Sequence, residues 1–215
     1  MGKATYRAAI CMGILCLLFA ASLTAYNLIQ DIQVGNESER IYHELGKRMG
    51  NGTRPERLND GNGVRENPIL PDYAYDSEFE MPTVENDSGI YIGILSIPEL
   101  NIGLPVAAEW SYAQLKKTPC RYFGSAYLND MVVCAHNYRT HFGALSTLSV
   151  GSPILFTDMD GNEFYYEVFD VEILGADQET EMTSYDEGLT LFTCTFGGKN
   201  RVTVRAVRIE AEGKR

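Results

Sequence analysis

The sequence predicts an all-β domain, a closed barrel or a sandwich, preceded by an N-terminal transmembrane helix. Three observations support this prediction. Residues 8–30 carry no charged side chain. Residues 89–215 contain seven or eight short runs rich in β-branched and aromatic residues, at the spacing typical of barrels and sandwiches. Segments with helical periodicity are few and short in that region. The hydrophobic content of 45% is that of a globular protein.

The apolar run at the N-terminus is long enough to cross a bilayer. It extends over the 23 residues between Arg7 and Asp31, which as a helix would measure about 34 Å. Lys3 and Arg7 precede the run and acidic residues follow it, so the positive-inside rule places the rest of the chain outside the cell. A signal peptide cleaved near the small residues at 20–22 is the alternative. The length of the run favours an uncleaved, single-pass anchor in the cell membrane.

Residues 31–88 are expected to form an extracellular spacer that is partly disordered. The segment 50–68 is rich in Asn, Gly, Asp, Glu and Pro and cannot bury much apolar surface. The segment SERIYHELGKRMG (38–50) can form a short helix. The predicted division of the chain is therefore a cytoplasmic tip and anchor over 1–30, a spacer over 31–88 and a folded domain over 89–215.

The expected strands of the folded domain follow one another with few helical interruptions. They are IYIGILSI (90–97), LNIGLPVA (100–107), MVVCAHNY (131–138), PILFTD (153–158), NEFYYEVFDVEIL (162–174), LTLFTC (189–194) and RVTVRAVRIE (201–210). A short helix is expected at SYAQLKK (111–117). The dipeptide Asp-Gly before residue 162 indicates a hairpin turn between two of these strands.

The last two strands can be oriented from their alternation. In LTLFTC the two leucines fall on one face, and Phe192 and Cys194 fall on the other. In RVTVRAVRI the small and branched residues should face the core, whereas Arg201, Thr203 and Arg205 should face outwards. A turn through TFGGKN then makes Cys194 and Arg201 cross-strand neighbours with Cβ atoms about 5 Å apart. The thiol and the guanidinium are expected to share an outer groove.

This juxtaposition, with a histidine at a strand end, suggests acyl-transfer chemistry. A nearby cation favours the thiolate form of Cys194, which is the nucleophile. His136 ends a strand and could protonate a leaving group, since the pKa of histidine lies near neutrality; His141 lies in the following loop. Arg201 could bind the oxyanion of a tetrahedral intermediate. The alternative is a membrane-anchored, non-catalytic β-domain with a buried Cys194 that binds a wall polymer or a protein partner.

Composition and spacing argue against several other functions. The net charge is −11 and no basic patch occurs, so nucleic acid is not an expected partner. No Cys-x-x-C pair or metal-like Cys/His spacing is present, and neither a metal nor a cofactor is expected. Cys120 and Cys134 could form a disulfide, or they could be two buried, inert thiols.

The chain resembles the sortases, the cell-wall cysteine transpeptidases of Gram-positive bacteria. The resemblance rests on SIPELNIGLPV, VVCAHNY, LTLFTCT and RVTVRAVRI, spread over residues 96–209. The resemblance implies a closed eight-stranded β-barrel and matches His136, Cys194 and Arg201 to the catalytic His, Cys and Arg of the family. The other cysteine transpeptidases and peptidases fit less well, because an L,D-transpeptidase needs an S-x-G-C-like motif and a papain-like enzyme has its Cys before its His.

The resemblance also implies a substrate and a route. Cys194 would attack the Thr carbonyl of an LPxTG-like sorting signal at the C-terminus of a protein, and an amino group of a peptidoglycan precursor or a pilin lysine would resolve the thioacyl enzyme. The segment 173–188 is short for a class B sortase, and no Asp-Pro-Trp or Asp-Pro-Phe lid occurs, so the chain looks closer to class A or D. Asp177, Glu179 and Glu181 are expected to be solvated rather than to bind calcium.

Overall fold

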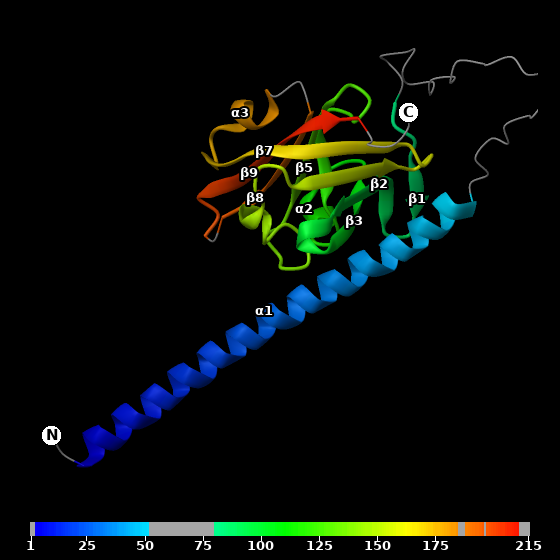
Figure 1. Cartoon of the computed structure of the whole chain (residues 1–215). Coiled ribbons are helices and arrows are strands. Elements are labelled where there is room, and N and C mark those ends of the chain that lie inside the picture. The colour runs from blue at the N-terminus through cyan, green and yellow to red at the C-terminus, as the bar shows by residue number, and fades with distance from the viewer. Residues whose placement is uncertain (1–2, 52–79, 185–187, 196, 211–215) are drawn as a thin grey trace, which may run out of the picture.

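The barrel predicted from the sequence is closed. The computed structural model describes residues 3–51, 80–184, 188–195 and 197–210. Nine strands form one sheet in the order β1-β2-β3-β4-β5-β8-β9-β7-β6, and β6 also pairs with β2. Eight strands therefore close on themselves, and β1 extends the sheet beside β2 (Figure 1). The sandwich that the strand spacing also allowed does not form.

The bounds of the strands agree with most of the expected runs. They are β1 (Val84–Asn86), β2 (Gly89–Ile97), β3 (Ile102–Ala107), β4 (Cys120–Phe123), β5 (Asp130–Ala135), β6 (Pro153–Asp158), β7 (Glu163–Gly175), β8 (Gly188–Cys194) and β9 (Asn200–Ile209). The sequence did not indicate β1 and β4, because three or four residues are too few to establish an alternation. The run expected over 131–138 ends as a strand at Ala135, which leaves His136 in a loop.

The helices are one long element and several short ones. They are α1 (Lys3–Asn51), α2 (Tyr112–Leu115) and α3 (Glu179–Thr183), with single 3-10 turns at η2 (Pro98–Leu100) and η3 (Leu145–Thr147). The expected helix over 111–117 forms as α2, and the Ser111 side chain caps it by accepting from the backbone N–H of Gln114. The expected hairpin turn joins β6 to β7, with Gly161 at a φ of 82°.

The inside of the barrel is filled by alternate residues of its strands. Leu189 and Leu191 of β8 and Val204 and Ala206 of β9 are fully buried in this core, as the alternation predicted. The opposite faces of the same strands form a second, smaller apolar layer outside the barrel, which includes Phe192.

The outer face of β9 differs in one respect from the expectation. Thr203 and Arg205 do point away from the barrel core, but they are buried, with 0% and 6% of their surface exposed. The Arg205 guanidinium donates hydrogen bonds to the Glu172 carboxylate, the Thr190 hydroxyl and the backbone carbonyls of 181 and 182. The connection from β7 to β8, which contains α3, therefore covers this part of the sheet.

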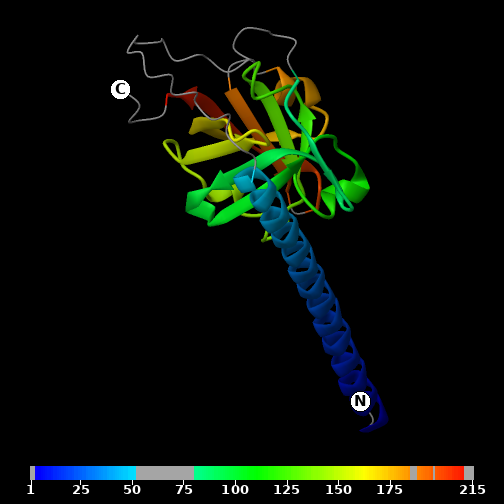
Figure 2. The same ribbon diagram turned by 90° about the vertical axis from the view of Figure 1, so that its right-hand side faces the viewer.

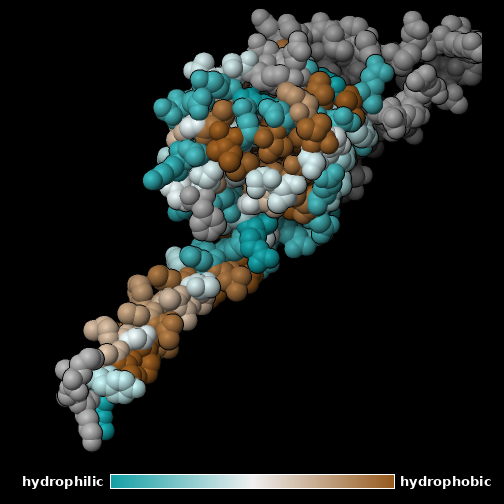
Figure 3. All heavy atoms as spheres, turned by 60° about the vertical axis from the view of Figure 1, so that its left-hand side comes forward, coloured by the Kyte–Doolittle hydropathy of each residue, from teal (hydrophilic) through white to brown (hydrophobic). Residues whose placement is uncertain are grey.

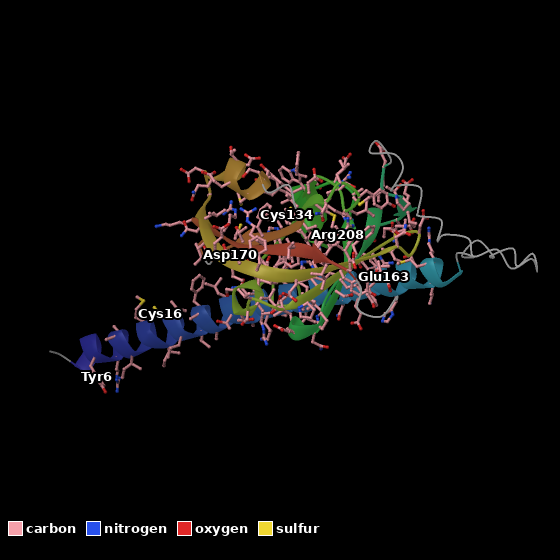
Figure 4. The ribbon with its side chains drawn as sticks, turned by 45° about the horizontal axis from the view of Figure 1, so that its top comes forward. Tyr6, Cys16, Cys134, Glu163, Asp170 and Arg208 are labelled. Atoms are coloured by element: carbon pink, nitrogen blue, oxygen red, sulfur yellow. The ribbon has the colours of Figure 1, made fainter. Side chains whose placement is uncertain are left out.

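The first half of α1 projects beyond the barrel (Figures 1 and 2). Its apolar side chains are exposed, and Figure 3 shows them gathered along the projecting segment. Tyr6 and Cys16 lie on this part of the helix (Figure 4). The helix is long and apolar enough to cross a membrane by its length and composition.

The second half of α1 packs against the barrel. Val34, Ser38, Ile41 and Leu45 are buried and recur at helical spacing, so they form one stripe along the helix. The helix expected over 38–50 thus forms, but as a continuation of α1 that contacts β3. Residues 31–51 therefore pack on the domain, whereas the sequence predicted a spacer over 31–88. Residues 52–79 of that spacer lie outside the described residues.

Candidate active site

Two parallel strands bring His136 and Cys194 together. Strands β5 and β8 run side by side in the register Cys134 with Phe192 and Ala135 with Thr193. One position beyond the last pair come His136, which directly follows β5, and Cys194, which ends β8. The Thr193 hydroxyl donates a 2.8 Å hydrogen bond to the carbonyl of Ala135, which ties the two strands together directly beneath the site.

The predicted pairing of the thiol with the guanidinium is present. Strands β8 and β9 are antiparallel, and Cys194 is the register partner of Arg201. The turn between them is closed by the amide of Thr195, which donates to the Asn200 carbonyl at 2.9 Å. Both Cys194 and Arg201 are half-buried, so the pair lies at the rim of the barrel rather than within its interior.

The guanidinium of Arg201 is held by backbone acceptors. Its Nη1 donates to the carbonyl of Gly198 at 3.0 Å and to that of Asn200 at 3.1 Å. These bonds orient the side chain and leave three of its five N–H donors for another partner. An anionic oxygen next to the Cys194 sulfur could take such a position.

His136 lies at the start of a compact loop. The carbonyl of His136 accepts from the amide of Phe142, and the ring of His136 meets that of Tyr138 edge to face at 5.3 Å. Burial and, to a smaller degree, the charge of Lys116 hold the pKa of His136 below its usual range. The imidazolium of His136 is therefore a stronger acid than that of a free histidine, as suits a group that gives a proton to a leaving amine.

The other candidate histidine is enclosed. His141 has 1% of its surface exposed. Burial, reinforced by the nearby charge of His136, lowers the pKa of His141 to about 4. Its ring lies 5.7 Å from that of Tyr138. Of the two histidines, His136 is half-buried and His141 is enclosed.

The two remaining cysteines of the barrel are buried free thiols. Cys120 of β4 and Cys134 of β5 are register partners, and both lie on the outer face that Cys194 shares (Figure 4 labels Cys134). Burial raises the pKa of Cys120 to about 12, and burial also raises the pKa of Cys134. Neither of these two thiols ionises readily at neutral pH, and of the three cysteines in the barrel only Cys194 is not fully buried.

One wall beside Cys194 is formed by residues that the sequence did not indicate. Met182 of α3 is buried in the outer apolar layer that contains Phe192, two residues before the thiol. Tyr122 of β4 packs edge to face on Phe192 at 5.3 Å, and its hydroxyl donates to the Glu179 carboxylate of α3. This hydrogen bond raises the pKa of Tyr122 to about 12. The aromatic pair Tyr-Phe between Pro119 and Gly124 was the only sequence signal for β4.

A surface pocket opens on the far side of Tyr122. It has a volume of about 400 Å³ and is lined by Ala108, Glu109, Trp110, Arg121, Tyr122, Phe123 and Gly124. Trp110 lies 5.8 Å from the Tyr122 ring. An aromatic row therefore leads from this pocket through Tyr122 to Phe192 and the site.

The part of the chain that the structure describes holds no acidic cluster near the site that suits a metal. Within the described ranges, no group of three or more His, Cys, Asp or Glu side chains could hold a metal ion. Glu179, one of the acidic residues considered from the sequence, is engaged by Tyr122.

Comparison with known proteins points to one family. The family model for the sortase domain matches residues 95–209. A sequence comparison with curated proteins found no match. Similar solved structures include a pilus-related sortase C of Group B Streptococcus, with 26% identity and a TM-score of 0.52 over 60% of this chain and 71% of that one.

Two further structures extend the similarity. A sortase C from Clostridium perfringens SM101 is 23% identical, with a TM-score of 0.50 over 83% of this chain and 95% of that one. A lid mutant of sortase A from Corynebacterium diphtheriae is 23% identical, with a TM-score of 0.51 over 63% of this chain and 75% of that one. Because both sortases C and a sortase A are among these structures, the proximity to class A or D stays a prediction.

Proposed function

The chain belongs to the sortase family, and from this premise we propose that Cys194, His136 and Arg201 carry out its transpeptidation. The observation that supports this most strongly is the register of three neighbouring strands. On one side of the half-buried Cys194, this register places Arg201 of β9. On the other side it places the end of β5, which leads to His136.

In the first step the thiolate of Cys194 attacks the carbonyl carbon of the Thr residue in an LPxTG-like sorting signal. Arg201 donates hydrogen bonds to the oxyanion that forms, and removing one such donor costs about 3 kcal/mol in related chemistry. The C–N bond then breaks, His136 gives its proton to the departing amine, and a thioester between the peptide and Cys194 remains.

In the second step an amino group attacks the thioester carbonyl. His136, now neutral, accepts a proton from this amine, and the Cys194 thiolate leaves as the new amide forms. The amine is supplied by a peptidoglycan precursor or by a pilin lysine. The donor is a protein that carries the sorting signal at its C-terminus, and the first half of α1 anchors the enzyme in the cell membrane with the barrel outside.

A transpeptidation assay tests this function. The full chain in detergent would be incubated with peptides of the type Leu-Pro-x-Thr-Gly and with either hydroxylamine or a lysine-containing peptide as the acceptor. Wild type should yield the acyl product on the acceptor and release the glycine fragment. Cys194→Ala should yield neither.

Two results would contradict the proposal. Turnover that persists in Cys194→Ala would remove this thiol from the mechanism. A folded wild type that processes none of the peptides, and whose Cys194 resists alkylation, would favour a barrel that binds a wall polymer or protein partner without catalysis.

A further inference from the structure

The loop that follows His136 is fastened to the membrane-proximal part of α1. The amide of Arg139 donates a 3.0 Å hydrogen bond to the Asp31 carboxylate. The Thr140 hydroxyl makes a longer contact of 3.5 Å with the Asp31 backbone carbonyl. One turn further along the helix, a Cβ atom at Gly35 would lie 2.7 Å from Thr140 Cγ2, so loop and helix pack closely here.

The same loop is internally rigid, so a contact at one point constrains His136. The carbonyl of Tyr138 accepts from the amides of His141 and Gly143 at 3.0 and 2.9 Å. The ring of Tyr138 stands between the rings of His136 and His141. Phe142 is fully buried in the barrel core and anchors the loop from the other side.

From these contacts we propose that Asp31 is a positioning residue for His136. The carboxylate holds the peptide unit three residues after His136, and the loop transmits this restraint to the imidazole through Tyr138. The inference rests on the proposed function, because it assigns a role in that reaction. It makes residues 31–35 of α1 a part of the active unit rather than of a spacer.

The position of Asp31 in the chain adds a spatial consequence. It is the first charged residue after the uncharged run 8–30, and it therefore lies where the helix would leave the bilayer. The loop of His136 would then be held at the membrane surface. A rigid helix fixes both the height of the site above the bilayer and the orientation of its histidine.

The expected effect follows from the sensitivity of proton transfer to geometry. A displacement of 1 Å can cost about 10²-fold in rate. Because the loop keeps its internal bonds and its Phe142 anchor, we expect Asp31→Ala to lower kcat about 10-fold, with KM for the peptide changed less than about twofold. The loosened loop should also expose His136, and the pKa seen in the rate profile should rise towards its ordinary value.

The experiment compares three variants of the full chain in detergent, with a quenched fluorogenic peptide containing Leu-Pro-x-Thr-Gly. Asp31→Ala removes the acceptor. Asp31→Asn keeps an oxygen that accepts from the Arg139 amide and should restore kcat. Glu37→Ala is the matched control, because Glu37 accepts a 3.0 Å bond from Ser88 and ties α1 to the barrel away from the loop. It should weaken docking of α1 and leave kcat unchanged.

The measured quantities are kcat, KM, the pH profile of kcat, and hydrogen exchange at the Arg139 amide. The charged groups around His136 that could also move the profile are Lys116 near α2, Cys194 on β8, Arg201 on β9 and His141 in the loop. They are the same in all three variants, so a change confined to Asp31→Ala belongs to the loop.

The outcomes separate this inference from the proposed function. An inactive wild type contradicts the proposed function, and the inference falls with it. An active wild type with an unchanged Asp31→Ala overturns the inference alone. So does an Asp31→Asn variant as slow as Asp31→Ala, because then charge and not the contact would matter. Equal losses in Glu37→Ala would show that general docking of α1 is responsible.

Discussion

The rim and the buried outer layer of the barrel contain the same kinds of side chain, but these side chains differ in burial and in pKa. Cys194 is half-buried at the end of β8, whereas Cys134 on the neighbouring strand is enclosed and its pKa is raised by burial. His136 begins the loop at the rim, whereas His141, five residues later, is buried and its pKa is lowered to about 4.

The arginines of β9 repeat the contrast. Arg201 at the rim donates to two backbone carbonyls. Arg205, four residues further along β9, donates to Glu172, to Thr190 and to the backbone carbonyls of 181 and 182. The difference shows that residue type alone does not make a site here. Position along the strand decides which of two like side chains is accessible at the rim and which is buried.

The thiols should give the largest difference. Cys194→Ala should lower turnover at least about 10⁴-fold, because no other group can form the thioester. Cys134→Ala should retain turnover and lose about 1 kcal/mol of unfolding free energy, because a small buried side chain is removed. Peptide cleavage and urea unfolding of both variants measure the two effects. Cleavage abolished equally in both would break the distinction between the rim and the buried outer layer.

The arginines should separate activity from stability. Arg201→Lys should lower kcat/KM by about 10²-fold, because an ammonium does not reproduce the donor geometry of a guanidinium at the oxyanion. Arg205→Lys should instead lower the unfolding free energy by about 2 kcal/mol, because buried acceptors lose their donors. Normal turnover in a folded Arg201→Lys would remove Arg201 from the mechanism.

The buried histidine should reveal itself through the pH dependence of stability. The pKa of His141 is about 4 in the folded protein and 6.5 ordinarily, so the unfolded state takes up a proton first as the pH falls. The contribution to stability is complete above pH 6.5 and is lost down to about pH 4, with about 2 kcal/mol lost between pH 7 and pH 5.

His141→Leu provides the comparison for this titration, since it cannot take up the proton. Unfolding by urea at several pH values should show a flatter profile in the variant than in wild type over the same window. Identical profiles would mean that His141 does not titrate as a buried group.

Two glycines of α1 extend the contrast between exposed and packed positions. A Cβ atom at Gly46 would meet no other atom within 4 Å. Gly46→Ala should therefore raise the unfolding free energy by about 1 kcal/mol through its helix propensity. Gly35→Ala has the same intrinsic gain, but its Cβ would press on Thr140, so the gain should be cancelled. Thermal unfolding of the full chain measures both, and an equal gain at the two positions would argue against the close packing of α1 on the loop.

Local patterns in the sequence were sufficient for the central hairpin of the site. The alternation of LTLFTC and RVTVRAVRI predicted which faces of β8 and β9 fill the barrel, and the intervening turn predicted the pairing of Cys194 with Arg201. His136 was predicted from its place after an apolar run, although the run ends as a strand one residue before it.

The remaining features depend on contacts between distant segments. The burial of Arg205 follows from the connection that carries α3, which no alternation in β9 records. The contact of Asp31 with Arg139 joins residues 108 positions apart. The apolar stripe on α1 lies among many charged residues. The sequence therefore did not indicate that residues 31–51 pack on the barrel.

The most direct test of the rim site is the location of the acyl group. The full chain in detergent would be incubated with a Leu-Pro-x-Thr-Gly peptide, quenched, and examined by intact mass spectrometry and peptide mapping. A thioester confined to Cys194 and absent from Cys194→Ala is the predicted result. An adduct on Cys120 or Cys134, or substrate cleavage without any adduct, would contradict the assignment of Cys194 as the nucleophile.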